Sequence, residues 1–242
     1  MLEIKDLTFQ VAGKQILKGI NLVIPDGKLI ALTGPNGGGK TTLAKMIAGV
    51  EKPTSGQILL DGVDIVPMDP TERAKAGVGY AFQQPVRFKG ITVRDMLTMA
   101  NGGPLTQEEV SDVLMQVGLS AESYADRGVD THLSGGEIKR IEIATVLLRK
   151  AKIAVFDEPE AGIDLWSFNN LIRVFQDLRE ERNRSLVIIS HQERILSIAD
   201  EIVMIQDGKV GLKGDSKTIF PRLLCKNEGC DEHCVKEGGC RE

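Results

Sequence analysis

Apolar and polar side chains alternate along the first quarter of the chain, as they do in strands that bury one face. The alternation runs through residues 1–28, with breaks at Ala12-Gly13 and Asp26-Gly27, and returns at residues 57–65 around Asp61-Gly62. Turn-forming pairs between alternating segments are typical of hairpins. The pattern therefore predicts an N-terminal subdomain of antiparallel strands.

A different pattern follows, in which short continuous apolar runs precede segments with helical spacing. Strand-sized runs lie at 29–32, 78–82, 152–156 and 186–190, and helical periods at 42–48, 165–179 and 192–199. A last hairpin is expected at 201–210. Buried strands that alternate with helices indicate a parallel sheet, so the fold class is α/β.

The segment between residues 86 and 150 interrupts this alternation with helical periods alone. Helices are expected at 92–100, at 106–117 and from Ser134 onward, with a loop-rich stretch at 119–132. The pairs Thr106/Glu109 and Ser134/Glu137 have the spacing of capping boxes at helix starts. We expect an inserted helical subdomain here.

The stretch between the first buried strand and its helix matches the phosphate-binding pattern G-x-x-x-x-G-K-[ST]. Glycines in such a loop let successive backbone N–H groups converge on a polyphosphate, while the lysine reaches the β/γ-phosphates and the next hydroxyl can bind Mg²⁺. The helix N-terminus adds a positive dipole end. The predicted ATP-binding residues of this loop are Gly34, Pro35, Asn36, Gly37, Gly38, Gly39, Lys40, Thr41 and Thr42.

Two further groups of polar side chains follow buried strands. Asp157 and Glu158 end the run at 152–156, and His191 ends the run at 186–190. Ligands of parallel sheets bind at the carboxyl ends of strands, so these side chains are expected to meet the phosphate loop. We assign Asp157 to Mg²⁺, Glu158 to general-base catalysis and His191 to sensing the γ-phosphate.

Taken together, these motifs resemble those of ATP-binding-cassette (ABC) ATPases along residues 1 to about 220. The resemblance identifies Gly34–Thr42 as Walker A, Ile153–Glu158 as Walker B and His191 as the switch histidine. It makes Gln83 the Q-loop glutamine, with a catalytic and Mg²⁺-binding role, and Leu133–Glu137 the signature. It implies an ATP-dependent head-to-tail homodimer in which Ser134, Gly135 and Gly136 cover the partner's ATP, and it adds Asp164 to the nucleotide-binding residues.

One position departs from the common family pattern. Many cassettes carry an aromatic side chain that stacks on adenine where this chain has Val11. Phe9 lies two residues away on the same predicted strand face and is the candidate substitute. Phosphate and metal binding do not depend on this position.

Within the family, several short segments resemble SufC, the ATPase of the SUF iron–sulfur cluster assembly system. These segments are 137–143, 160–164 and 190–196. The implied function is a soluble ATPase that drives conformational change in a SufB-like scaffold partner. The alternative is the ATP-binding subunit of an ABC membrane transporter. A DNA-maintenance ATPase would need a long coiled-coil insertion, which the sequence lacks.

Composition bears on which partners and which cellular compartment to expect for the protein. The chain has 242 residues, a net charge of −4 and no long basic run, so direct nucleic-acid binding is not expected. No apolar run approaches the roughly 20 residues that cross a bilayer, and the first residues do not form a secretion signal. We therefore expect a cytoplasmic protein without a transmembrane segment.

All four cysteines lie within the final 18 residues, at Cys225, Cys230, Cys234 and Cys240. Three interpretations stay open: a solvated tail of reduced thiols, disulfides, or a thiolate site for Zn²⁺ or an iron–sulfur cluster. The spacings match neither common zinc nor ferredoxin patterns. The expected organisation is thus a nucleotide-binding core at 1–85 and 151–220, a helical subdomain at 86–150 and a Cys-rich tail at 221–242.

Overall fold

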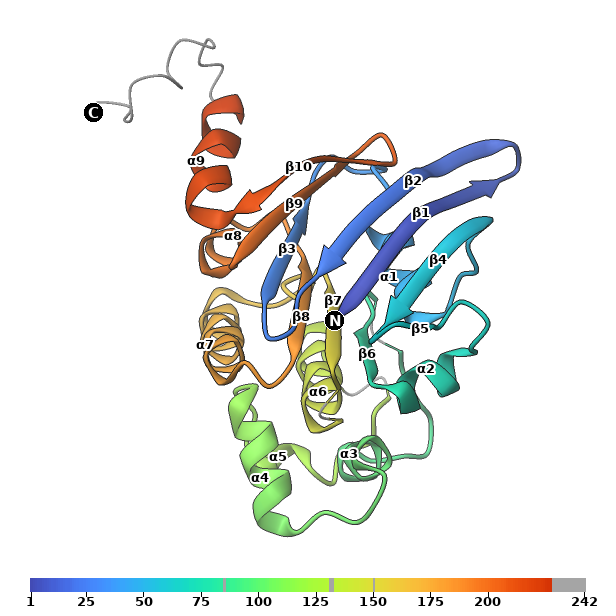
Figure 1. Cartoon of the computed structure of the whole chain (residues 1–242). Coiled ribbons are helices and arrows are strands. Elements are labelled where there is room, and N and C mark those ends of the chain that lie inside the picture. The colour runs from blue at the N-terminus through green and yellow to red at the C-terminus, as the bar shows by residue number, and fades with distance from the viewer. Residues whose placement is uncertain (85, 131–132, 150, 228–242) are drawn as a thin grey trace, which may run out of the picture.

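Two β-sheets and the helix α1 form the centre of the molecule (Figure 1). The computed structural model describes residues 1–84, 86–130, 133–149 and 151–227, with side chains as far as Leu224. One sheet is antiparallel, in the order β2-β1-β4-β5, and the other has six strands, in the order β10-β9-β3-β8-β7-β6. The expected α/β fold with an antiparallel β subdomain is confirmed.

The antiparallel sheet contains long strands where the sequence indicated short ones. Its strands β1 and β2 pair over most of their length, with irregular register at three points. The bounds are β1 Leu2–Val11, β2 Lys14–Ile24, β4 Ser55–Leu60 and β5 Val63–Asp64.

In the six-stranded sheet, β6, β7, β8, β3 and β9 run parallel, and only β10 is antiparallel to its neighbour. The central strands β3, β7 and β8 are buried throughout, which explains their continuous apolar sequences. The bounds are β3 Leu29–Thr33, β6 Val78–Ala81, β7 Ile153–Asp157, β8 Ser185–Ile189, β9 Glu201–Gln206 and β10 Lys209–Asp215.

The helices divide between the two faces of this sheet. On one face α1 packs among residues of both sheets, and on the other α6, α7 and α8 share a core that continues into α3 and α4. The helical segment therefore has no separate core of its own among the described residues. The bounds are α1 Lys40–Ala48, α2 Pro70–Ala76, α3 Val93–Asn101, α4 Gln107–Gln116, α5 Ala121–Tyr124, α6 Gly135–Leu148, α7 Leu165–Glu181, α8 Glu193–Ile198 and α9 Ser216–Asn227.

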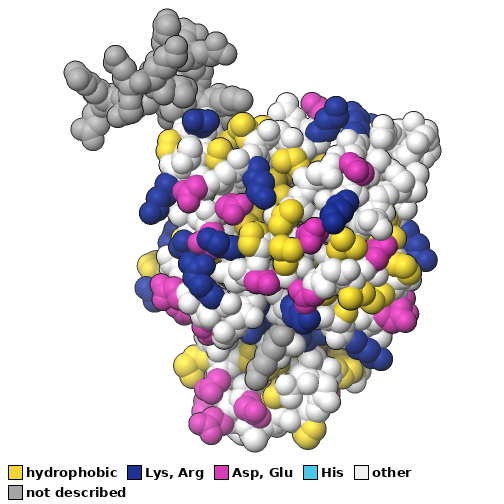
Figure 2. Space-filling view, viewed as in Figure 1, with side chains coloured by type: hydrophobic (Ala, Val, Ile, Leu, Met, Phe, Trp, Pro, Cys, Tyr) yellow, Lys and Arg dark blue, Asp and Glu magenta, His cyan; other side chains and the backbone are white. Residues whose placement is uncertain are grey.

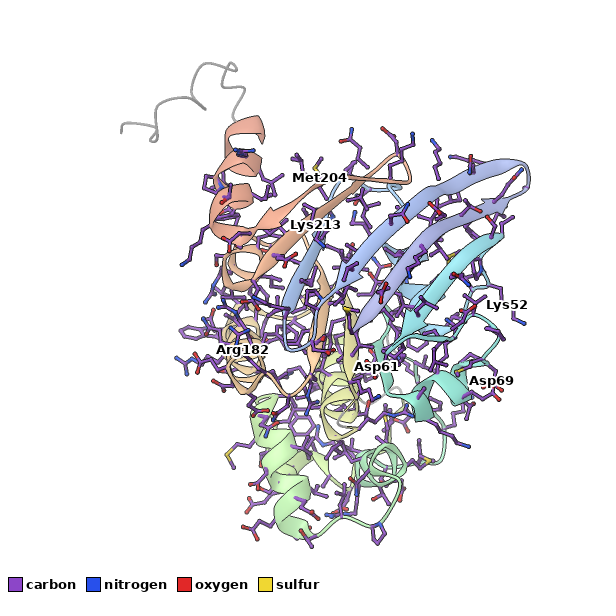
Figure 3. All side chains as sticks on the ribbon, viewed as in Figure 1. Lys52, Asp61, Asp69, Arg182, Met204 and Lys213 are labelled. Atoms are coloured by element: carbon purple, nitrogen blue, oxygen red, sulfur yellow. The ribbon has the colours of Figure 1, made fainter. Side chains whose placement is uncertain are left out.

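Three helical features differ from the sequence-based expectation. The helix α2 begins at a proline behind a capping box of Asp69 and Glu72, and Figure 3 places Asp69 at that start. The short helix α5 lies within the stretch expected to be loop-rich. Finally, α9 continues past residue 220 into the predicted tail. Cys225 lies in this helix, with its side chain outside the described residues, and Cys230, Cys234 and Cys240 lie outside them altogether.

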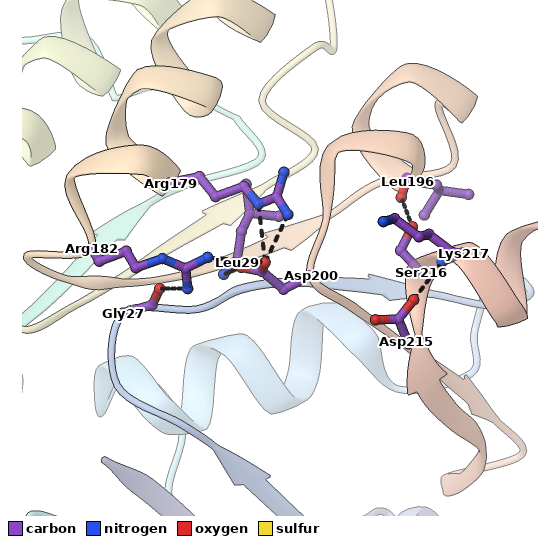
Figure 4. Close-up of polar contacts among 9 residues, drawn as sticks. All are labelled: Gly27, Leu29, Arg179, Arg182, Leu196, Asp200, Asp215, Ser216 and Lys217. Carbon is purple, nitrogen blue, oxygen red and sulfur yellow. Dashed lines mark hydrogen bonds and ion pairs between the residues drawn. The ribbon is translucent and has the colours of Figure 1, made fainter.

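The carboxylate of Asp200 holds the six-stranded sheet at the N-terminal end of β3 (Figure 4). Asp200 accepts hydrogen bonds from the backbone N–H of Leu29 and from Arg179, at 2.9 and 2.8 Å. Burial acts to raise the pKa of Asp200, but the hydrogen bonds from Arg179 and Leu29 and the nearby positive charges together lower it. The start of β3, and hence the approach to the phosphate loop, is tied to α7 in this way.

On the face shown in Figure 2, basic and acidic side chains are interspersed, apart from acidic side chains that gather over α4. That helix exposes Glu108, Glu109 and Asp112. No helix among the described residues is long and apolar enough to cross a membrane.

Candidate nucleotide-binding site

The glycine-rich loop between β3 and α1 is shaped by contacts with the turn after β9. The N–H of Gly208 donates to the carbonyl of Gly38 at 3.1 Å. Gly34 has a φ of 126°, and a Cβ there would lie 2.2 Å from the carbonyl oxygen of Ile205. Gly39 has a φ of 105°, and its Cβ would lie 2.6 Å from the Leu17 side chain. Any other residue at Gly34 or Gly39 would be strained in this loop conformation, so both positions require glycine.

Lys40, the first residue of α1, turns its side chain back onto this loop. Its Nζ donates to the carbonyl oxygens of Gly34 and Pro35 at 2.6 and 3.0 Å, and the residue is only 6% exposed. Burial lowers the pKa of Lys40, while the nearby Glu158 and Asp157 carboxylates act in the opposite direction. A buried ammonium that only carbonyls satisfy is placed to transfer its hydrogen bonds to an entering polyphosphate.

The carboxylate of Asp157 lies at the end of β7 behind the first turn of α1. It accepts hydrogen bonds from the Thr41 hydroxyl and the Tyr80 hydroxyl, both at 3.2 Å. Asp157 is fully buried, and burial raises its pKa. The same surroundings raise the pKa of Tyr80 through burial and the Asp157 charge. Thr41 and Asp157 therefore present adjacent oxygen ligands.

Glu158 and Gln83 meet at the opening of the site. The Nε2 of Gln83 donates to Glu158 Oε2 at 2.7 Å. Glu158 has a φ of 46°, in the left-handed region that non-glycine residues rarely adopt. Such a backbone conformation at the end of a buried strand turns the carboxylate out of the sheet, and strain of this kind is typical of functional positions.

Residues of the glycine-rich loop and of the start of α1 line one cavity of about 420 Å³ together with Gln83 and Glu158. Sequence reasoning missed Lys14 and Ile16 of β2, because a strand residue gives no motif. The structure brings the phosphate loop, Gln83 and Glu158 together as predicted. The lining residues are Lys14, Ile16, Asn36, Gly37, Gly39, Lys40, Thr41, Thr42, Gln83 and Glu158.

His191 follows β8 and lies beside the loop, in a neighbouring cavity of about 380 Å³ that it lines with Gly34, Pro35 and residues of α9. Desolvation lowers its pKa, and the Lys40 charge lowers it further, whereas Glu158 opposes both. The imidazole is therefore favoured in its neutral form near pH 7, able to donate or accept one hydrogen bond.

The start of α6 lies apart from this cavity. Ser134 is engaged in the predicted capping box, with its N–H donating to Glu137 at 2.7 Å and the Glu137 N–H donating to the Ser134 hydroxyl at 3.2 Å. Glu137 also accepts from the Tyr124 hydroxyl, which lowers its pKa. Ser134 and Gly135 are exposed, so within one chain this helix start faces solvent.

Asp164 and Val11 also lie outside the cavity lining. Asp164 caps α7, accepting from the Ser167 N–H at 3.0 Å, and the segment before it packs on the start of α6, where a Cβ on Gly136 would lie 2.8 Å from the Gly162 carbonyl. Val11 is 51% exposed at the end of β1. Phe9 is partly buried and packs against the core, so it is not free to replace an adenine-stacking ring.

The residues present fit a Mg²⁺–nucleotide. The glycine cradle leaves room for phosphates where side chains would collide with the backbone, and the neighbouring Thr41 and Asp157 oxygens are the hard ligands that Mg²⁺ prefers. No group of three or more His, Cys, Asp or Glu side chains within the described residues is arranged to hold another metal ion.

Comparison with known proteins agrees with this geometry. The family model described as ABC transporter matches residues 17–161. The chain is 39% identical over 227 residues to an uncharacterized ABC transporter ATP-binding protein of Methanocaldococcus jannaschii, covering 90% of each chain. It is 37% identical over 243 residues to a probable ATP-dependent transporter of Pyropia yezoensis, covering 92% of this chain and 94% of the relative.

Among solved structures, the chain is similar to cbiO1 of Clostridium perfringens, described as part of the ABC transporter complex cbiONQ. The TM-score is 0.76 at 29% identity, covering 94% of this chain and 93% of the other. These names are those of transporter ATPases, and they do not single out the SufC branch. The chain belongs to the ABC transporter ATPase family, and it is an ATPase.

Proposed function

We propose that this chain is the ATP-hydrolysing subunit of a membrane transporter of its family, with MgATP bound between the glycine-rich loop and Glu158. The observation that carries the proposal is the convergence of Lys40, Thr41, Gln83 and Glu158 on one cavity, with Asp157 directly behind Thr41. The transport role is supported by relatives that are named as transporter components and that match nearly the whole chain.

In this proposal Lys40 and the backbone N–H groups of the loop bind the β/γ-phosphates. Thr41, Asp157 and Gln83 would hold Mg²⁺, and a bound Mg²⁺ would supply positive charge to neutralise phosphate charge in the transition state. The Gln83 amide has two ends, so its oxygen can face the metal while its Nε2 continues to hold Glu158. Glu158 accepts a proton from the attacking water, and the neutral His191 contacts the γ-phosphate.

The exposed start of α6 supports a site shared by two chains. Within one chain the Ser134–Gly136 segment does not line the cavity beside the phosphate loop, although its capped and glycine-rich N-terminus is suited to an anion. We place it over the ATP of a second copy, in an ATP-dependent head-to-tail homodimer. Glu158→Gln protein with ATP should elute as a dimer in light-scattering chromatography, and a monomer at high protein and ATP concentrations would contradict this arrangement.

A second candidate function is the SUF role, with a SufB-like scaffold as partner. The segment Glu160–Asp164 favours it, because it reads Glu-Ala-Gly-Ile-Asp where transport ATPases commonly carry S-A-L-D. Glu160 is held in this segment by a hydrogen bond from the Ser190 hydroxyl. A pull-down with tagged full-length protein separates the two roles. Transport predicts a polytopic membrane protein among the captured proteins, and cluster assembly predicts a soluble scaffold without one.

We also propose that Cys225, Cys230, Cys234 and Cys240 bind Zn²⁺ or an iron–sulfur cluster. The support is the confinement of all four cysteines to 18 residues of a chain that has none elsewhere. Anaerobically purified protein should contain about one equivalent of zinc, or show iron–sulfur absorbance after reconstitution, and truncation after Leu224 should remove it. Metal content that truncation leaves unchanged would contradict the proposal.

A further inference from the structure

The signature helix α6 carries two buried charged residues whose role lies beyond the anion site at its start. Lys139 is fully buried and Glu142 is 7% exposed, one turn apart on the same helix. Burying charges is costly unless each is paired and hydrogen-bonded. Their position at the interface between the helical segment and the strand ends therefore calls for an explanation.

Both side chains bind the backbone of Phe82, the residue that precedes Gln83. Lys139 Nζ donates to the carbonyl oxygen of Phe82, and Glu142 Oε1 accepts from the Phe82 N–H at 2.8 Å. Lys139 Nζ also donates to the carbonyls of Gln83 and Asp157, each at 3.2 Å. One residue of the loop after β6 is thus held at both its donor and its acceptor.

The contact set joins the elements that we assign to Mg²⁺. Gln83 directly follows Phe82, whose backbone both side chains bind. Asp157 supplies the third carbonyl that Lys139 binds, after those of Phe82 and Gln83. Gln83 itself is exposed and its side chain meets only Glu158 among the described residues. Its backbone position is therefore determined by α6 rather than by packing of its own side chain.

We propose that Lys139 and Glu142 are positioning residues that place Gln83 for metal binding. The inference rests on the proposed role of Gln83 as a Mg²⁺ ligand. Because the same helix begins at Ser134, it also links the surface offered to a partner's ATP with the metal site of its own chain. No sequence motif gives either position a role, so the role became visible only in the fold.

The test measures equilibrium binding of a non-hydrolysable ATP analogue to the full-length protein with and without Mg²⁺. The dissociation constant without Mg²⁺ divided by that with Mg²⁺ reports how much the metal site strengthens binding. No turnover is needed for this measurement. Gln83→Ala should lower this ratio about tenfold, and Lys139→Met and Glu142→Leu should lower it to a similar extent. Glu142→Gln keeps an acceptor for the Phe82 N–H, so it should retain the wild-type ratio.

Adding Lys139→Met to Gln83→Ala should cause no further fall, because the lysine acts through the glutamine. The matched control is Arg184→Met, which removes a hydrogen bond of 3.0 Å to the Leu147 carbonyl at the other end of α6. It should lower thermal stability and leave the ratio unchanged.

Four results would overturn the inference. A folded Lys139→Met protein with the wild-type ratio would show that α6 does not position the metal site, as would an additive double variant. Should Lys139→Met fail to fold, equal ratios for Glu142→Gln and Glu142→Leu would do the same. An unchanged ratio in Gln83→Ala would instead remove Gln83 from the metal, and with it the premise of the positioning role.

Discussion

The two helix starts that are suited to phosphate, those of α1 and α6, are built in opposite ways. The loop before α1 is enclosed, since added Cβ atoms at Gly34 and Gly38 would lie 2.2 and 2.7 Å from the Ile205 carbonyl oxygen. At the start of α6, an added Cβ on Gly135 would meet nothing within 4 Å. One start is a finished cradle within the chain, and the other is, in the proposed homodimer, half of a site that a second chain completes.

The largest effect is expected at the catalytic residue of the enclosed site. Glu158→Gln removes the proposed base and keeps the shape, so kcat should fall about 10³-fold while MgATP binding stays. Steady-state ATPase assays and equilibrium binding measure the two quantities. Wild-type turnover in this variant would show that Glu158 is not the base.

A matched pair of glycine substitutions tests the difference between the enclosed and the open helix start. Gly34→Ala introduces a Cβ into the backbone of β9 and should lower the free energy of unfolding by about 3 kcal/mol. Gly135→Ala adds a helix-favouring residue in open space and should raise it by about 0.5 kcal/mol. Chemical denaturation measures both, and equal losses would contradict the distinction.

Gly135→Ala should nevertheless weaken the ATP-dependent dimer, because the added methyl group stands where the partner's phosphates are expected. Light scattering of the variant combined with Glu158→Gln, at increasing ATP, measures this. The single Glu158→Gln variant is the control. Identical dimerisation of the two proteins would mean that this helix start does not face a second chain.

The smallest effect concerns Glu160, on the segment between the two regions. Burial raises the pKa of Glu160 above its ordinary value of 4.5. The folded state therefore binds more protons than the unfolded state above pH 4.5, and this carboxyl's contribution to stability is lost as pH rises through the folded pKa. Glu160→Gln should gain stability relative to wild type as pH increases from about 4.5, as measured by urea denaturation across pH. A relative stability that does not change with pH would contradict this.

The sequence was sufficient for the parts that depend on local pattern. The phosphate loop, the capping boxes at Thr106 and Ser134 and the strand ends at Asp157 and His191 each follow from a motif or a period. The strands β3, β8 and β7 are parallel neighbours, so their carboxyl ends lie on the same side of the sheet, as the βαβ pattern predicted.

The parts that depend on distant partners could not be found in the same way. Lys139 and Glu142 are charged residues, and their burial depends on partners distant in the sequence. Both bind the backbone of Phe82, 57 and 60 residues away, and Lys139 also binds the carbonyls of Gln83 and Asp157. The helix α2 escaped notice for a related reason. Its one buried side chain is Arg73, which donates to carbonyls of α1 and of the loop before α2 rather than forming an apolar stripe.

The most direct test of the difference between the two helix starts mixes two defective chains. Lys40→Ala disables the cradle of α1, and Gly135→Arg disables the start of α6. If each site combines one α1 with the partner's α6, a mixed dimer places both defects in one site and leaves the other intact. We expect ATPase activity that is absent from either variant alone to appear on mixing. A mixture as inactive as its components, or full activity of Gly135→Arg alone, would contradict it.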